Sequence, residues 1–487
     1  MTFFCLIFIF QSFTFSQEIP NTFFSYKKEI FDYNIGKNWH KNTTLGAPRF
    51  DNYRKKMDLD SLQIDYRIGF YNLNQSIALY GFGQFFYKNN FYGYLYPRIV
   101  NDVNFLIGYS GIPRDIKRGG FSSGETDLSG IGYQNNWFFF QIGRGRENWG
   151  SGNGIELALT NNSPSYDYLA IGSNYGKLNV KYFHGFLENY NGYNRYIIGR
   201  GIEWLNKKNL LIGISEIIIY SGINRSIDLG YLNPLGSHLE TELNNRLNIT
   251  GTESANAVWQ IALDYLFNNK IRFSSNFLID EFVLDKIEKD KGKEHGKAFS
   301  SKIVYSPIYQ NGHLLNIFIS FIHVGTPTFR HSMGMNNFIQ RNKPLGWGLG
   351  SDSDEIIIGL NYLKNNDFLV EFNLGKRRSG IENILERAYE PFSDYLYGTF
   401  PSGETNEITF IGLKYNYFIS NKISFFGEFN CNMSKGEKEY SFKLGTDMYL
   451  FNTIKKNHVA FSTRHTKTPP RHGSVSNAFP HIPTRSM

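Results

Sequence analysis

The residues best suited to bind a ligand lie in one glycine-rich segment, 143–169, which reads GRGRENWGSGNGIELALTNNSPSYDYL. The indole of Trp149 offers a flat face on which a sugar ring can stack. Arg144 and Arg146 carry guanidinium forks that match carboxylate groups. This combination predicts a site for acidic sugars. The alternative role of the two arginines is to pair with acidic side chains inside the protein.

Three more polar side chains of this segment complete the candidate polysaccharide-binding site. Glu147 and Asn148 stand directly before the tryptophan and can form hydrogen bonds with sugar hydroxyl groups. Asp167 follows twenty residues after Glu147 and is expected to order the arginines. We therefore predict that these side chains converge when the segment folds.

The glycines of the same segment, Gly150, Gly152 and Gly154, have a structural interpretation. Glycine-rich loops can hold phosphate groups, but here neither a GK[ST] element nor a following helix is present. Glycine accepts backbone conformations that other residues avoid. We expect these positions to let the chain fold tightly against itself, inside the lumen of the surrounding structure.

Catalytic and metal-binding patterns are not found in the sequence. Asp280 and Glu281 are the most suggestive acidic pair, but neighbours on a strand point to opposite faces and cannot flank one glycosidic bond. The histidines are dispersed, and no HxxxH or CxxC spacing occurs. We therefore expect no enzyme activity, no metal and no cofactor.

The elements that would position the candidate site show a repeating pattern with a period of two. In the segment 271–281, Ile271 and Phe277 alternate with Arg272 and Asn276, so that apolar and polar side chains fall on opposite faces of a strand. The pattern recurs along most of the chain. An apolar outer face and a polar inner face are typical of a barrel in a membrane. The fold class predicted is all-β, a closed antiparallel transmembrane β-barrel of about 18 strands (16–20).

Short turns and long connections separate the expected strands. The pattern predicts nineteen strands, although bacterial single-chain barrels have an even number, so one is spurious or another lies near 38–58. Brief turns on one side and long connections on the other are typical of outer-membrane barrels. The expected strands are 62–71, 76–87, 91–99, 103–111, 128–134, 137–144, 166–174, 178–187, 194–205, 210–221, 258–267, 271–283, 297–309, 314–325, 355–364, 367–377, 407–419, 423–433 and 440–451.

The chain divides into four expected parts. Residues 1–16 form an apolar run that ends in small residues and predict an export signal peptide. Residues 17–60 predict a periplasmic or lumen-lining extension, residues 61–452 the barrel, and residues 453–487 a disordered or aberrant tail. The net charge of +8 is scattered along the chain, which does not favour nucleic acid as a partner. We expect the barrel to be surrounded by outer-membrane lipid.

The site segment and several later strands carry a set of short motifs. They are the G-R-x-x-x-x-W-G-x-G run at Gly143–Gly152, Leu157–Thr160, Ser163–Pro164, Asp167–Leu169, Leu211–Gly213, Glu216, Ile219–Tyr220, Leu229–Tyr231, Asn233–Pro234 and Ile279–Phe282. On these motifs the sequence resembles the Wzi-type capsule assembly proteins of Gram-negative outer membranes. The resemblance implies a closed barrel that associates with capsular polysaccharide and helps capsule assembly or attachment. A passive porin for small solutes is the alternative function, and the sequence does not indicate an oligomeric state.

Overall fold

A computed structural model gives the fold of the protein. It describes residues 43–46, 61–73, 76–88, 90–103, 109, 111–115, 119–248, 255–281, 286–310, 313–364, 368–392, 398–420 and 423–457. The expected signal peptide, most of the expected N-terminal extension and residues 458–487 lie outside these ranges. The last strand continues to Asn457, beyond the expected barrel end at 452.

The described chain is all-β, as predicted, and 18 of its strands form one antiparallel sheet. Two further strands, β14 (Ile339–Gln340) and β15 (Lys343–Pro344), form a small separate ladder. The strands of the large sheet are β1 (Ser61–Leu73), β2 (Ser76–Tyr87), β3 (Phe91–Val100), β4 (Ser123–Gln134), β5 (Phe138–Gly145), β6 (Tyr166–Asn174), β7 (Leu178–Tyr190), β8 (Tyr193–Leu205), β9 (Leu210–Ile223), β10 (Ala255–Phe267), β11 (Ile271–Glu281), β12 (Gly296–Gln310), β13 (His313–Val324), β16 (Ser353–Lys364), β17 (Phe368–Ser379), β18 (Asn406–Ser420), β19 (Ile423–Ser434) and β20 (Glu437–Asn457).

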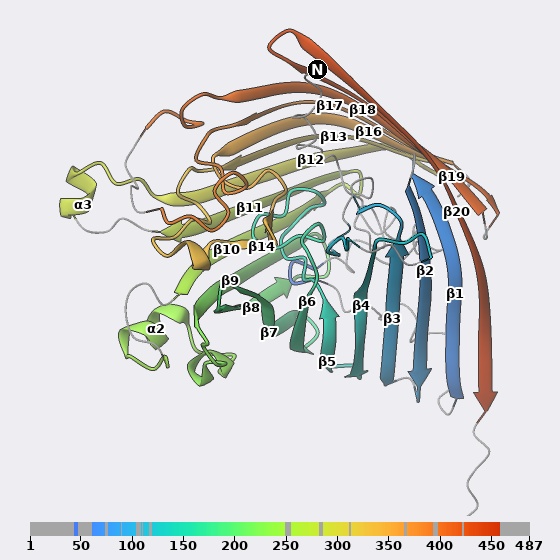
Figure 1. Ribbon diagram of the computed structural model, residues 1–487, viewed down its shortest axis with the longest axis horizontal. Coiled ribbons are helices and arrows are strands. Elements are labelled where there is room, and N and C mark those ends of the chain that lie inside the picture. Colours follow the sequence, from blue (N-terminus) through green and yellow to red (C-terminus); the bar gives the residue numbers. More distant parts are fainter. Residues whose placement is uncertain are drawn as a thin grey trace, which may run out of the picture.

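Each strand of the large sheet pairs with the strands that precede and follow it within that sheet. The first strand, β1, pairs with β2 and also with the last strand, β20, from Ser61 opposite Asn457 to Tyr71 opposite Asp447. Figure 1 shows the sheet curving around the segments that connect its strands.

The sheet of the described residues has 18 strands, an even number, and one of the nineteen expected strands has no counterpart in it. Of the expected strand 103–111, the described residues 103, 109 and 111 lie in no strand. Tyr109 is instead buried against Ala78 and Val100, and its hydroxyl donates to Ser123 Oγ at 3.1 Å. Of this expected strand, the described Tyr109 therefore belongs to a connection that packs on the sheet.

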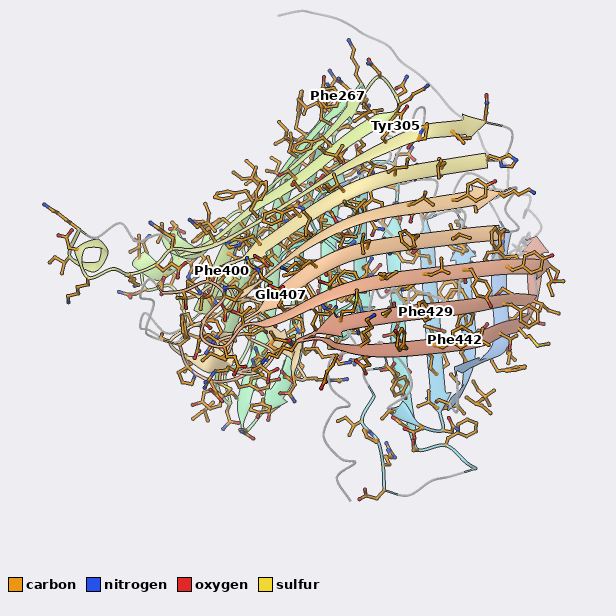
Figure 2. The ribbon with its side chains drawn as sticks, turned by 90° about the horizontal axis from the view of Figure 1, so that it is seen from above. Phe267, Tyr305, Phe400, Glu407, Phe429 and Phe442 are labelled. Carbon is orange, nitrogen blue, oxygen red and sulfur yellow. The ribbon has the colours of Figure 1, made fainter. Side chains whose placement is uncertain are left out.

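The connections sort by length between the two ends of the sheet. At the short-turn end, each connection has two to four residues, for example 206–209 between β8 and β9. The opposite, long-connection end carries 101–122, 146–165, 224–254, 282–295, 325–352 and 380–405, together with three two-residue turns. Figure 2 shows Phe400 and Glu407 toward the end from which α3 (Lys286–Asp290) projects, and Phe267 and Tyr305 near the other end. This asymmetry matches the expectation for an outer-membrane barrel.

The two faces of the sheet differ in polarity, as the period of two predicts. On β11, Arg272 and Asn276 are buried on the inner face, the face that packs against the connections. Ile271 and Phe277 on the same strand are exposed on the outer face. Exposed apolar side chains such as Ile214 and Ile261 continue this outer surface on neighbouring strands. A solvent-facing sheet of a soluble protein would carry polar side chains there.

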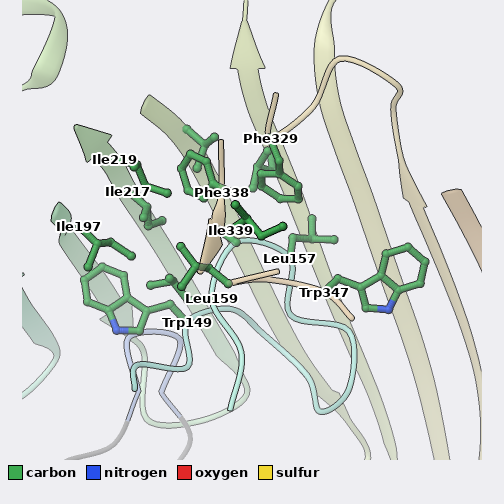
Figure 3. Packing of buried hydrophobic residues seen from close by; sticks show 14 of the residues in the cluster. Trp149, Leu157, Leu159, Ile197, Ile217, Ile219, Phe329, Phe338, Ile339 and Trp347 are labelled. Carbon is green, nitrogen blue, oxygen red and sulfur yellow. The ribbon is translucent and has the colours of Figure 1, made fainter. Parts of the chain in front are cut away.

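A hydrophobic core fills the space enclosed by the inner face next to the long-connection end. Connection 146–165 contributes Trp149, Leu157 and Leu159, and connection 325–352 contributes Phe338 and Ile339. Figure 3 shows these side chains packed against inward-facing residues of the sheet, among them Ile197, Ile217 and Ile219. Burial of this apolar surface stabilises the folded connections inside the sheet.

Residues 43–46 of the expected N-terminal extension also lie inside the sheet. The backbone N–H and the hydroxyl of Thr44 donate to Glu203 Oε2 at 2.6 and 2.9 Å, and Leu45 joins the hydrophobic core. Among the residues whose placement is described, no helix has the length and apolar character needed to cross a membrane.

Candidate functional site

The predicted site segment runs from the end of β5 through connection 146–165 to the start of β6. Arg144 and Asp167 lie opposite each other on these two strands, and Arg144 Nη1 donates to Asp167 Oδ2 at 3.1 Å. Both side chains point to the outer face, on the same side as the exposed Ile142. The expected partnership between Asp167 and an arginine therefore holds for Arg144, but at the exterior of the sheet.

Arg146 lies on the opposite side of the wall from this pair. Its guanidinium is buried and binds both carboxylate oxygens of Asp127, with Nη1 at 3.3 Å from Oδ2. Asp127 also lies 3.4 Å from Arg98 Nη2. Asp167 thus does not order Arg146. Of the two roles predicted for this arginine, the structure supports the internal ion pair.

Glu147 and Trp149 also face the interior. The Trp149 indole Nε1 donates to Glu147 Oε2 at 2.9 Å, and Lys181 Nζ lies 2.6 Å from the same oxygen. Trp149 is fully buried, and its ring meets Phe183 edge-on with centroids 5.2 Å apart. A ring enclosed in this way has no free face for a sugar. In this conformation Trp149 is therefore not placed to stack on a sugar.

The remaining predicted residues shape the same connection. Asn148 is half-buried and donates to Glu156 Oε1 at 3.2 Å. Gly150, Gly152 and Gly154 have φ values of 141°, 79° and 74°, which L side chains rarely adopt. A Cβ at Gly152 would also lie 2.9 Å from the Ser274 side chain on the sheet. The glycines thus let the connection fold tightly inside the sheet, as expected.

The predicted residues therefore do not form one site. Arg144 and Asp167 face outward, whereas Arg146, Glu147 and Trp149 take part in ion pairs and packing inside the sheet. Among the described residues, no group of three or more potential metal-ligating side chains is found.

A polar cavity at the long-connection end is the better candidate for a functional site. Its volume is about 430 Å³, and three connections contribute to it: 282–295, 325–352 and 380–405. Carboxylates, guanidinium groups, hydroxyls and one aromatic ring line it together. The lining residues are Glu294, Thr326, Arg330, Glu382, Arg387, Glu390, Pro391, Phe392, Gly398, Thr399 and Ser402.

Arg330 forms the fixed cationic part of the cavity. Its Nη1 donates to the Glu382 backbone carbonyl at 2.7 Å and to Glu382 Oε2 at 3.2 Å. The guanidinium also lies 4.5 Å from the centre of the Phe392 ring. Its Nε is buried and has no hydrogen-bond partner among the described residues. Burial lowers the pKa of Arg330, and Glu382 counteracts that effect.

Arg387 forms the accessible cationic part. Its Nη1 donates to Glu390 Oε2 at 2.8 Å, and its side chain remains 40% exposed. The hydrogen bond to Glu390 raises the pKa of Arg387. On another wall, burial raises the pKa of the Glu294 carboxyl above its ordinary value. The cavity therefore presents both hydrogen-bond acceptors and charged donors to a ligand.

Asp352 fixes the hydroxyl-bearing side of the cavity. Its Oδ1 accepts from Thr326 Oγ1 and from the Ser402 backbone N–H, both at 2.9 Å, and its Oδ2 accepts from Ser402 Oγ. Ser402 Oγ in turn accepts from the Glu382 backbone N–H at 3.0 Å. Asp352 is fully buried, and its hydrogen bonds join connection 325–352 to connection 380–405.

Sequence reasoning missed this cavity because its residues come from three long connections. Glu294, Arg330 and Arg387 are far apart in the sequence, and no local spacing relates them. The available signal was the length of the connections after the expected strands 314–325 and 367–377, since long loops on a rigid scaffold commonly carry function.

The described strands have the fold of an outer-membrane β-barrel. No protein-family profile matches the sequence, and no curated protein matches it. Among solved structures, the fold is similar to Wzi of Escherichia coli, an outer-membrane protein involved in group 1 capsule assembly and described as a carbohydrate-binding β-barrel. The TM-score is 0.55 at 11% sequence identity, and the match covers 79% of this chain and 84% of Wzi.

A second similar structure is OprD of Pseudomonas aeruginosa, with a TM-score of 0.42 at 10% identity, covering 80% of this chain and 95% of OprD. The likeness to Wzi confirms, at the level of the fold, the resemblance that the sequence motifs indicate.

Proposed function

We propose that this protein is a closed β-barrel of a bacterial outer membrane that binds surface polysaccharide and helps to assemble or retain a capsule. In this proposal the exposed apolar outer face contacts lipid, and the long-connection end faces the outside of the cell. Three features support it: the polarity of the two faces, the sorting of connection lengths and the fold shared with Wzi.

The cavity at the long-connection end is the observation that carries the polysaccharide assignment. Sugar hydroxyl groups both donate and accept hydrogen bonds, and the cavity offers partners of both kinds. The carboxylates of Glu294 and Glu390 can accept from hydroxyls, and Arg387 can donate to hydroxyls or to the carboxylate of an acidic sugar. Phe392 adds an apolar ring face to this set.

The filled interior argues against the alternative, a passive porin. Connections 146–165 and 325–352 meet inside the sheet and bury Trp149, Leu157 and Phe338 among inward-facing side chains. Porins of this strand number leave an aqueous channel. An apolar core of this extent supports a plugged lumen, and we expect the purified protein to conduct ions poorly.

Two measurements test the proposal. Purified protein is applied to an array of bacterial capsular polysaccharides, together with an Arg387→Ala variant. We expect binding to at least one polymer and about tenfold weaker binding by the variant, because a charged hydrogen bond to the ligand is lost. Lys208→Ala is the matched control, since Lys208 is exposed in the turn 206–209 at the short-turn end, away from the cavity.

The second measurement is made in cells. Deletion of the gene is expected to reduce cell-associated capsule. If the capsule stays attached and the uptake of small solutes changes instead, the porin function replaces the one proposed here.

A further inference from the structure

Residues 224–248, which we call the wall-covering segment, fold back along the outer face of β7 to β10. Tyr182 Oη on β7 donates to the Tyr231 carbonyl at 2.9 Å, and Tyr196 Oη on β8 donates to the Arg225 carbonyl at 2.8 Å. The His238 backbone N–H donates to Glu216 on β9 at 2.9 Å. Contacts to three successive strands fix the segment against the wall. In Figure 1, α2 (His238–Leu243) lies at the left margin of the sheet.

The part of the wall beneath this segment is polar, unlike the outer face next to it. Arg200 and Glu216 point outward from β8 and β9, lie 3.5 Å apart and are both buried under the segment. Trp259 Nε1 donates to the same Glu216 carboxylate at 3.0 Å. Without the segment, this ion pair would stand on the outer face of the sheet, where hydrocarbon makes a charge costly.

The exposed surface of the wall-covering segment combines large apolar side chains with polar ones such as Asn233 and Asn245. Its Glu240 carboxylate pairs with Arg246, and its Arg225 guanidinium pairs with Asp228 at 2.9 Å, so these charged groups have partners of opposite charge. His238 Nε2 lies 3.3 Å from Glu242. Large apolar side chains stand exposed between them, with Leu235 87% exposed and Leu229 78% exposed. The exposed set is Ile227, Leu229, Leu232, Leu235, Leu239 and Leu243.

This surface continues the apolar outer face of the strands. Toward the short-turn end, the outward side chains Ile202 and Ile214 are exposed on β8 and β9. Toward the long-connection end on the same faces, Ile198 and Ile218 are fully buried by the segment. Where the segment covers the strands, its exposed leucines therefore form the outermost apolar surface in place of the strand side chains.

We propose that the wall-covering segment is embedded in the outer leaflet of the membrane, with its leucines in contact with lipid acyl chains. The segment shields the Arg200–Glu216 pair and extends the apolar belt of the strands over it. This inference rests on the proposed membrane location of the sheet. It adds that a connection, and not only strands, forms part of the lipid-facing surface.

Site-directed spin labelling of the whole protein tests the proposal. In a Cys431→Ala background, a nitroxide is placed at Leu235→Cys or Leu243→Cys, and the protein is reconstituted in vesicles of phosphatidylcholine and lipopolysaccharide. Oxygen concentrates in the hydrocarbon, and a nickel chelate stays in water. We expect the ratio of oxygen to nickel collisions at both positions to be several-fold above that at Ile287→Cys on the projecting helix α3.

Ile261→Cys on β10 is the positive control, because Ile261 is an exposed outward residue of a strand. If Ile261 reports lipid and Leu235 reports water, the inference is overturned and the membrane location stands. Low collision rates with both reagents at Leu235 would also overturn it, since they would indicate contact with a second protein copy. If Ile261 itself reports water, the proposed function fails.

Discussion

Arg195 on β8 is fully buried and forms an ion pair with the half-buried Glu188 on β7, with Nη1 and Oε1 2.5 Å apart. Its other N–H groups reach connection 325–352. Nε donates to the Met335 carbonyl at 2.6 Å, Nη2 to the Asn337 carbonyl at 2.7 Å and Nη1 to the Ile339 carbonyl at 2.8 Å. One side chain therefore ties the wall of the sheet to the connection that fills it.

We expect Arg195→Ala to release this connection and to raise ion conductance in planar bilayers above that of the wild type. The change removes the charge partner of Glu188 and the hydrogen bonds to three backbone carbonyls, so the free energy of unfolding should fall by about 3–5 kcal/mol. Arg195→Lys keeps the charge but lacks the planar fork. Its conductance and its unfolding free energy should lie between those of the wild type and those of Arg195→Ala. Wild-type conductance and stability in the alanine variant would contradict this role.

Trp149 is expected to act in packing and not in ligand binding. Trp149→Ala should lower the free energy of unfolding by about 3–5 kcal/mol in urea titrations, because it removes a fully buried ring from the core. Trp149→Phe should retain part of this packing and should bind polysaccharide as the wild type does. Loss of binding by a stably folded Trp149→Phe would restore the interpretation of Trp149 as a sugar-stacking residue.

Replacing Arg144 and replacing Arg146 should lower the free energy of unfolding by very different amounts, although the two residues are only two positions apart. Arg146→Ala leaves the buried Asp127 short of a partner and should cost about 3–5 kcal/mol of unfolding free energy. In the Arg144–Asp167 pair the Asp167 side chain is largely exposed. Arg144→Ala should therefore lower the free energy of unfolding by about 1 kcal/mol or less. Equal effects in urea titrations would show that the two side chains do not lie on opposite faces of the wall.

Binding of an acidic polysaccharide should strengthen as the pH falls from neutral. Burial raises the pKa of Glu294 above its ordinary value of 4.5, so this carboxylate becomes neutral at a higher pH than usual and stops repelling an anionic polymer. The same protonation stabilises the fold: the gain appears as the pH falls through the raised pKa and is complete below 4.5.

The pH dependence can be measured by titrating polymer at several pH values. Glu294→Gln should bind the acidic polymer at neutral pH as the wild type does at low pH, and should lose most of the dependence. A neutral polymer provides the control, since its affinity should change little. An unaltered pH profile in Glu294→Gln would assign the dependence to another group.

The sequence was sufficient to predict the sheet because a period of two is a local property. The contrast between Arg272 and Ile271 on β11 reflects directly which side chain faces inward. The same rule failed at Tyr109, which belongs to an expected strand but packs as part of a connection. Alternation alone does not show whether a segment pairs with another strand.

The candidate site was harder to predict because its geometry depends on distant parts of the chain. Trp149 has the same chemistry whether it faces a sugar or a core, and only the positions of Phe183 and Leu45 decide between them. The cavity lined by Arg330 and Arg387 requires three connections to meet, and nothing in the spacing of these residues indicates that they do.

The pairing of β1 with β20 has a consequence for folding. Ser61 and Asn457 become neighbours only after the whole intervening chain has been made, so this ladder has a very high sequence separation. Loop-closure entropy makes such contacts slow to form. Until they form, both edge strands expose unpaired backbone groups that can aggregate. The nascent chain should therefore depend on a chaperone to keep those edges apart from other chains.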